Sequence, residues 1–173
     1  MLKFKNWIIN EGYDYSCVMA DFDFEKLIKW AKENVPESCL YYKENKDGYE
    51  LDPHVTVLYG LHTTNFKDVE KIIKNQKQFE IKLGKISIFD TNPDYDVLKI
   101  EVESDELRKL NDKLKSLPYT NSFKSYKPHC TIAYIKKGEC KDLIGNKTFY
   151  GKKFKIKELV FSPSSGSMVK MEL

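Results

Sequence analysis

A motif that occurs twice limits what this chain can fold into. Residues 52–59 read Asp-Pro-His-Val-Thr-Val-Leu-Tyr, and residues 127–134 read Lys-Pro-His-Cys-Thr-Ile-Ala-Tyr. Both copies place proline, histidine, threonine, a β-branched residue and tyrosine at the same offsets, and the two histidines, His54 and His129, are 75 positions apart. Both copies are rich in β-branched and aromatic residues, which predicts that both are strands. The repeat favours a fold with two related halves, each contributing one motif strand.

The spacing within each motif predicts a catalytic site. Side chains alternate between the two faces of a strand, so His54 shares a face with Thr56, and His129 shares a face with Thr131. A histidine titrates near neutral pH, so two histidines facing one substrate can divide the roles of general base and general acid. The threonine hydroxyls can donate hydrogen bonds to the non-bridging oxygens of a phosphate. This combination needs no metal or other cofactor, and it suits attack on a phosphodiester by a ribose 2′-hydroxyl, or by water on a 2′,3′-cyclic phosphate.

Two other interpretations compete with this one. A single histidine in a strand usually serves packing, but packing does not require proline, histidine, threonine and tyrosine to recur together. A metal site would need a third ligand, and the remaining histidine, His62, follows Gly60 in an expected solvated loop without a partner motif. The four cysteines form no Cys-x-x-Cys pair, so we expect buried thiols in a reducing compartment and no zinc site.

The composition excludes several classes of protein. Hydrophobic residues make up 41% and charged residues 32% of the 173 residues, as in a folded globular chain. There is no apolar run near 18 residues and no signal-peptide pattern, so we expect a cytoplasmic protein without a membrane segment. A net charge of +3 is too small to suggest long-range attraction to duplex nucleic acid. Arg108 is the single arginine and falls in an expected helix, so an anion would be held by hydroxyls, imidazoles, lysines and backbone groups.

The order of elements predicts an α+β chain with one bilobal domain over residues 1–173. Strand, helix and motif strand follow one another over residues 15–60 and again over 79–135. We expect two antiparallel sheets related by a pseudo-two-fold axis, with flanking helices and a central cleft. The individual expectations are helices that begin at Asp23, Asn65 and Ser104, and strands over residues 15–20, 39–42, 54–59, 79–89, 95–102, 154–161 and 168–173, in addition to the second motif.

The paired His-x-Thr motifs resemble those of the 2H phosphoesterase superfamily, which is named for its two histidines. The resemblance covers nearly the whole chain and implies the bilobal, LigT-like fold of that superfamily. It also implies that His54 and His129 are the acid/base pair and that Thr56 and Thr131 bind the phosphate. Which histidine is the base is left open by the sequence.

Two stretches, residues 52–61 and residues 15–19, are further similar to phage anti-CBASS nucleases. This similarity implies a metal-independent enzyme of the host cell cytoplasm that cuts 3′,5′ bonds in cyclic di- and trinucleotide immune signals and leaves linear 3′-phosphate products. The alternatives are an RNA-end 2′,3′-cyclic phosphodiesterase, a 2′,5′-oligoadenylate phosphodiesterase, and a protein that sequesters a nucleotide without cutting it.

Five further residues are candidates, three for contacts with bases and two for packing away from the site. Tyr15, or alternatively Tyr13, opens the first expected strand, where its ring can stack on a base. Glu158 can accept a hydrogen bond from an adenine amino group. Tyr59 and Tyr134 lie at odd offsets from their histidines, so strict alternation predicts that they face away from the site and pack.

Overall fold

A computed structural model describes residues 15–43, 48–120, 123 and 125–173. Its strands are β1 (Ser16–Asp21), β2 (His54–Leu61), β3 (Phe79–Phe89), β4 (Tyr95–Glu103), β5 (His129–Lys136), β6 (Lys153–Ile156), β7 (Glu158–Ser162) and β8 (Val169–Glu172). Its α-helices are α2 (Glu25–Asn34), α3 (Phe66–Ile73) and α4 (Asp105–Leu114), and two short 3₁₀ helices cover Glu37–Cys39 and Lys141–Leu143. The chain is therefore α+β, as the order of elements predicts.

The strands form one antiparallel sheet in the order β6-β3-β4-β5-β2-β1-β7-β8. Each half contains a strand, a helix and a motif strand in that order: β1, α2 and β2 in one half, and β4, α4 and β5 in the other. The halves meet where the two motif strands pair, through the single residue pair Val55 and Cys130. The two sheets expected from the sequence are thus continuous, and the motif strands lie at the centre of the combined sheet.

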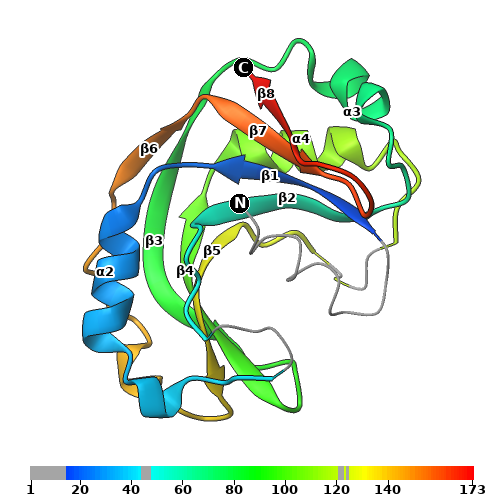
Figure 1. Ribbon diagram of the computed structural model, residues 1–173. Coiled ribbons are helices and arrows are strands. Elements are labelled where there is room, and N and C mark those ends of the chain that lie inside the picture. Colours follow the sequence, from blue (N-terminus) through cyan, green and yellow to red (C-terminus); the bar gives the residue numbers. More distant parts are fainter. Residues whose placement is uncertain (1–14, 44–47, 121–122, 124) are drawn as a thin grey trace.

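The sheet is strongly curled, and the connection between β6 and β7 explains why. These two strands lie at or near opposite edges of the sheet, yet only Lys157 separates them in sequence. One intervening residue spans about 7 Å, so the two ends of the sheet must approach one another. Figure 1 shows this curvature, with β6 leading into β7 as the chain passes from one half to the other. The single strand expected over residues 154–161 is therefore wrong, because its two ends pair with β3 and with β1.

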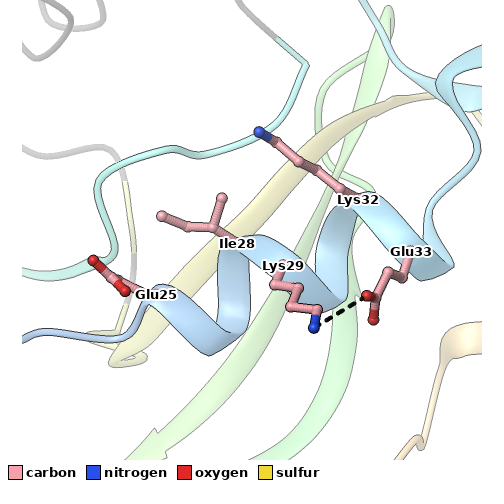
Figure 2. Close-up of a pocket in the computed structure, with 5 residues that line it drawn as sticks. All are labelled: Glu25, Ile28, Lys29, Lys32 and Glu33. Carbon is pink, nitrogen blue, oxygen red and sulfur yellow. Dashed lines mark ion pairs between the residues drawn. The ribbon is translucent and has the colours of Figure 1, made fainter.

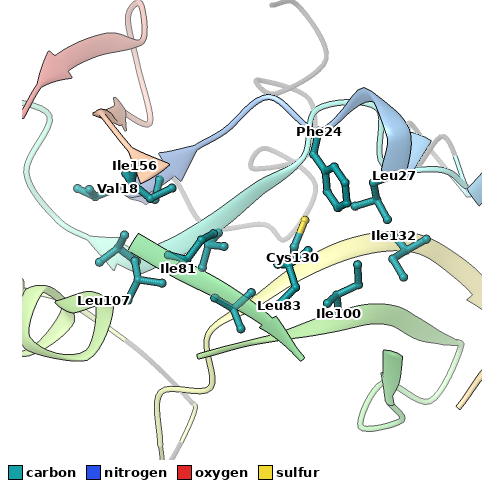
Figure 3. Packing of buried hydrophobic residues seen from close by; sticks show 14 of the residues in the cluster. Val18, Phe24, Leu27, Ile81, Leu83, Ile100, Leu107, Cys130, Ile132 and Ile156 are labelled. Carbon is teal, nitrogen blue, oxygen red and sulfur yellow. The ribbon is translucent and has the colours of Figure 1, made fainter. Parts of the chain in front are cut away.

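The helices cover one face of this sheet and bury the main hydrophobic core there. Leu107 of α4 and Leu27 of α2 join Val55 and Cys130 in one continuous apolar cluster. Figure 3 shows Cys130 within this cluster, among side chains from several strands. Burying each such aliphatic side chain stabilises the fold by about 1.5–3 kcal/mol. Because Val55 and Cys130 point into this core, their neighbours along each strand point to the opposite face.

The helix starts follow the predicted caps in two of three cases. The Asn65 side chain accepts a hydrogen bond from the backbone N–H of Lys67, and Ser104 Oγ accepts one from Leu107. Asp23 is not the cap of α2, since that position is Phe24 and no side chain caps it. The expected strand over residues 39–42 is also wrong: the chain there leaves a 3₁₀ helix and makes one isolated bridge, from Leu40 to β5. Within the described ranges, no helix is both long and apolar enough to cross a membrane.

Candidate active site

The four residues singled out by the repeated motif lie together on the sheet face opposite the helices. Val55 pairs with Cys130 across the junction of β2 and β5. In an antiparallel register, the residues on either side of such a pair also lie opposite each other. His54 therefore faces Thr131, and Thr56 faces His129. Each histidine is thus flanked by the threonine of its own strand and by the threonine of the neighbouring strand.

The proline before each histidine fixes how its ring is held. A residue that precedes proline is restricted to extended conformations, which applies here to Asp52 and Lys127. The carbonyl of Asp52 lies 2.9 Å from Nδ1 of His54, and the carbonyl of Lys127 lies 2.7 Å from Nδ1 of His129. A carbonyl can only accept, so Nδ1 carries a proton in both rings. Nε2 is therefore the ring nitrogen through which either histidine would exchange a proton, and the two motifs are equivalent in this respect.

His129 lies in a setting that favours the neutral imidazole. Burial lowers the pKa of His129 to about 4; the hydrogen bond to the Lys127 carbonyl opposes this effect, while the positive charges of Lys99 and His54 add to it. The Phe89 ring packs edge-on against the His129 ring with their centroids 4.8 Å apart. A neutral imidazole at neutral pH is ready to accept a proton.

His54 lies instead beside two acidic side chains. Asp21 is its cross-strand neighbour on β1, and Glu50 precedes the motif in the same half. Burial raises the pKa of both carboxyl groups, and the positive charge of a protonated His54 opposes this shift in each. The two histidines therefore differ in their charged neighbours: Lys99 acts on His129, whose cross-strand carboxylate, Glu101, is exposed, whereas the carboxyl groups beside His54 are partly buried.

Each motif strand carries one extra residue just after its threonine. Thr56 pairs with Met19 of β1, but Leu58 pairs with the adjacent Val18, so Val57 is the extra residue of a β-bulge. The bulge turns the carbonyl of Val57 out of the strand ladder, where the side-chain amide of Asn111 in α4 donates to it at 2.7 Å.

The second motif strand has the same irregularity at the equivalent place. Thr131 pairs with Lys99 of β4, but Ala133 pairs with the adjacent Leu98, which leaves Ile132 as the extra residue. The carbonyl of Ile132 accepts a hydrogen bond of 2.9 Å from the backbone N–H of Glu50, which lies outside the ladder. The pseudo-symmetry of the chain thus extends to the bulges.

The bulges reverse the expected orientation of Tyr59 and Tyr134. One extra residue shifts the alternation by one, which returns both tyrosines to the face of the histidines. Tyr59 packs there against Cys17 and Met19, and the Tyr134 ring lies 5.6 Å from that of Tyr95. The prediction that both tyrosines face away is wrong, because strict alternation holds only where the register with the neighbouring strand is regular.

Comparison with known proteins identifies the family. A family model described as the 2′-5′ RNA ligase superfamily matches residues 30–162, a range that includes both motif strands. The chain belongs to the 2′-5′ RNA ligase superfamily. This agrees with the resemblance of its two motifs to those of the 2H phosphoesterases. No curated protein sequence matches the chain significantly.

Solved structures show that the fold of this superfamily member is LigT-like. Escherichia coli LigT complexed with 3′-AMP superposes with a TM-score of 0.64 at 13% identity, covering 91% of this chain and 94% of LigT. Kluyveromyces marxianus Usb1 with uridine monophosphate gives a TM-score of 0.58 at 11% identity, covering 92% of this chain and 98% of Usb1. The Thermus thermophilus protein TT0787 gives a TM-score of 0.57 at 14% identity, covering 92% of this chain and 94% of TT0787.

Tyr15 lies on the histidine face of the superfamily fold but at some distance from the histidines. It directly precedes β1 and lies four residues before Met19, the cross-strand neighbour of Thr56. Four residues correspond to roughly 13 Å along the strand. Its ring stacks on His62 at 5.2 Å and meets the edge of Tyr59 at 6.4 Å. His62 is exposed, as expected, but its Nε2 also lies 2.8 Å from Thr120 Oγ1. The role of Tyr15 in base stacking stays a prediction, and the alternative, Tyr13, falls outside the described residues.

Glu158 lies closer to the centre of the site. It begins β7 next to the residue that pairs with Ala20, so it extends the cross-strand row of His54 and Asp21 by one strand. Its carboxylate accepts a hydrogen bond of 2.5 Å from Lys170 on β8. A base amino group would therefore share this carboxylate with Lys170, and recognition of adenine by Glu158 stays a prediction.

A ligand could also bind at a metal cluster or in a pocket away from the histidines. Among the residues that the structure describes, no three His, Cys, Asp or Glu side chains are grouped to hold a metal ion. A shallow pocket runs along the outer side of α2, where Lys29 and Glu33 pair at 3.8 Å (Figure 2). Because α2 packs on the core face of the sheet, this pocket is separated from the histidines by the sheet itself.

One residue near the site was not expected from the sequence. Lys99 lies in β4 opposite Thr131, and its side chain is buried on the histidine face. The signal that was available is a single lysine inside the apolar run from Val97 to Ile100.

Proposed function

We propose that this protein is a metal-independent phosphodiesterase that acts on nucleotides through the paired histidines. The observation that carries the proposal is the arrangement at the β2–β5 junction, where two imidazoles with the same Nδ1 hydrogen bond lie beside two threonine hydroxyls. Two groups that exchange protons through Nε2 are what an in-line displacement at phosphorus requires on its attacking and leaving sides.

The electrostatic contrast between the histidines supports one assignment of roles. In the first step, His129 takes the proton of a ribose 2′-hydroxyl, the 2′-oxygen bonds to phosphorus, and the bond from phosphorus to the 5′-oxygen breaks. His54, in its protonated form, gives its proton to that leaving oxygen. The products are a 2′,3′-cyclic phosphate and a free 5′-hydroxyl.

The second step uses the same two groups in exchanged roles. His54, now neutral, takes a proton from water, whose oxygen bonds to phosphorus. The bond to the 2′-oxygen breaks, and His129 returns the proton to it, leaving a 3′-phosphate. Both histidines end in their starting states, so the cycle needs no external acid or base. Thr56 and Thr131 donate hydrogen bonds to the non-bridging oxygens, which gain negative charge as the new bond forms.

The proposed substrate is a cyclic di- or trinucleotide with 3′,5′ bonds. Support for a nucleotide comes from LigT and Usb1, which were solved with 3′-AMP and uridine monophosphate. Support for a cyclic oligonucleotide comes from the similarity of residues 15–19 and 52–61 to phage anti-CBASS nucleases. Aromatic rings on the histidine face, among them Tyr59 and Tyr15, are suited to stacking on bases.

A panel of substrates in EDTA tests this proposal. The panel contains 3′,3′-cyclic GMP–AMP, cyclic tri-adenylate, an RNA with a 2′,3′-cyclic end and a 2′,5′-linked oligoadenylate. The proposal predicts linear products with 3′-phosphates from the cyclic substrates and no dependence on added metal. Cleavage confined to the RNA end or to the 2′,5′ bonds would mean that the substrate is not a cyclic nucleotide, while the two-histidine mechanism would still hold. Tight binding of a cyclic nucleotide that remains intact would show sequestration and refute the enzymatic proposal.

A further inference from the structure

Lys99 occupies a central position on the histidine face. Its neighbours across the sheet are Ser87 on β3 and Thr131 on β5, and His54 follows in the same row on β2. The Lys99 residue is 5% exposed, which is rare for a lysine because removing an ammonium group from water is costly unless an opposite charge compensates it.

The contacts of Lys99 do not supply that opposite charge. Nζ donates a hydrogen bond of 2.7 Å to Ser87 Oγ and lies 4.2 Å from the centre of the Phe89 ring. Among the described residues, no carboxylate forms an ion pair with Lys99. Other strand lysines differ: Lys82 pairs with Glu103 at 2.7 Å. Lys99 is therefore a buried cation held by neutral groups.

The same contacts connect Lys99 to His129. The Phe89 ring that lies below the Lys99 ammonium also packs edge-on against the His129 ring. Burial lowers the pKa of Lys99, Glu101 opposes this and Lys127 adds to it, while the charge of Lys99 contributes to the lowered pKa of His129. The charged or titratable groups next to His129 are thus Lys99, its exposed cross-strand neighbour Glu101 on β4 and, across the junction, His54.

We propose that Lys99 is an electrostatic positioning residue that keeps His129 in its neutral, proton-accepting form and supplies the positive charge that a bound phosphate requires beside Thr131. This deepens the proposed function, on which it rests. It also explains how a site without an arginine holds an anion: the single arginine, Arg108, lies on α4 and donates to the Tyr126 carbonyl at 3.3 Å. The anion would complete the environment of the buried ammonium, with which no carboxylate of the described residues forms an ion pair.

Three variants test the proposal: Lys99→Met, Lys99→Arg and the control Lys82→Met, which removes a partly exposed lysine from the adjacent strand. Histidine NMR titration of each variant reports the protonation of His129 without requiring activity. Lys99→Met is expected to raise the pKa that this titration measures for His129 by roughly half a unit to one unit. It is also expected to weaken 3′-AMP binding about 10-fold and to slow turnover by about 10-fold or more. Lys99→Arg should keep the His129 titration, 3′-AMP binding and turnover close to their wild-type values, and Lys82→Met should change none of the three.

Separate outcomes distinguish failure of this proposal from failure of the proposed function. If the wild-type protein cleaves nothing in the panel, the proposed function fails, but the titration and 3′-AMP binding still decide the role of Lys99. An unchanged His129 titration and unchanged 3′-AMP binding in Lys99→Met would overturn it. If Lys99→Met does not fold, as judged by circular dichroism, Lys99→Gln replaces it and must give the same shifts.

Discussion

At the level of single residues, the site depends on how two chemically identical groups are made different. The Pro-His dipeptides give both rings the same hydrogen bond through Nδ1, to the carbonyls of Asp52 and Lys127. Their neighbours then make the two rings different, because the charge of Lys99 acts on His129, whereas the carboxyl groups of Asp21 and Glu50 lie near His54. Acid and base roles can therefore arise from identical sequence motifs placed in unlike surroundings.

The pH dependence of turnover should report the neutral state of His129. With a pKa of about 4, His129 is unprotonated at neutral pH and becomes protonated, and unable to act as base, only as the pH falls toward 4. We expect kcat/KM for the transfer step to stay level on the acid side down to about pH 5 and then to fall. A pH–rate profile measures this directly. A decline that begins between pH 6 and 7 would mean that His129 is not the base or is not in the environment described.

The threonine hydroxyls should matter for turnover more than for stability. Valine has nearly the shape of threonine and suits a strand, so Thr56→Val and Thr131→Val should each change the free energy of unfolding by less than about 1 kcal/mol. Turnover should fall about 10²-fold in each, because a hydrogen-bond donor to the developing charge is lost. Thr148→Val, in an exposed turn, is the control for steady-state kinetics and urea unfolding. Loss of folding in step with activity would assign the hydroxyls a structural role.

At the level of strands and helices, the β-bulges in β2 and β5 shape the site. The repeated motif predicts both strands correctly, and the caps Asn65 and Ser104 mark two helix starts. The bulges were not predictable in this way, because a bulge is defined by register against a neighbouring strand and not by the sequence of one strand. The orientation of Tyr59 and the burial of Lys99 depend on the same pairings, which is why sequence reasoning misplaced the first and missed the second.

Asn111 should be the helix residue that matters most for the β2 bulge. Its side chain donates to the carbonyl of Val57, and both are buried. Asn111→Leu leaves this carbonyl without its donor and should lower the free energy of unfolding by about 1–3 kcal/mol. Turnover should fall even at temperatures where the variant is folded, since Thr56 precedes the bulge directly. Chemical denaturation and kinetics measure the two effects.

The matched control for Asn111 is Asn34→Leu. Asn34 also donates from its side chain to a backbone carbonyl, that of Trp30, but it lies at the exposed end of α2. We expect it to change stability by less than about 0.5 kcal/mol and to leave turnover unchanged. Equal effects from the two substitutions would contradict a special role for the bulge.

Taken over the entire chain, the site exists only because distant segments meet. The two motif strands are far apart in sequence and join at the Val55–Cys130 pair, while Lys157 holds the two ends of the curled sheet together. The sequence predicted two related halves, but not that they share one sheet, because the side chains that form the junction are ordinary core residues. An intact junction is therefore a condition for any activity.

Cys130 offers a direct probe of that junction. Burial raises the pKa of its thiol, and the side chain is fully buried in the core. Because the thiolate is the reactive form, we expect Cys130 to remain unmodified by iodoacetamide in the native protein and to react only at the rate of unfolding. Mass spectrometry of the labelled peptides measures this rate, with the less buried Cys39 as the internal comparison. Rapid native labelling of Cys130 would show that the two halves separate readily.

The proposed mechanism requires both imidazoles to act on the same phosphorus atom, and turnover of the substrate by His54→Ala, His129→Ala and the double variant tests this most directly. Groups that act as one unit are not additive when removed. We predict that each single variant loses about 10²–10⁴-fold in kcat, and that the double variant is hardly slower than the worse single one. A single variant with nearly wild-type turnover, or losses that multiply in the double variant, would contradict the claim that the two histidines form one catalytic unit.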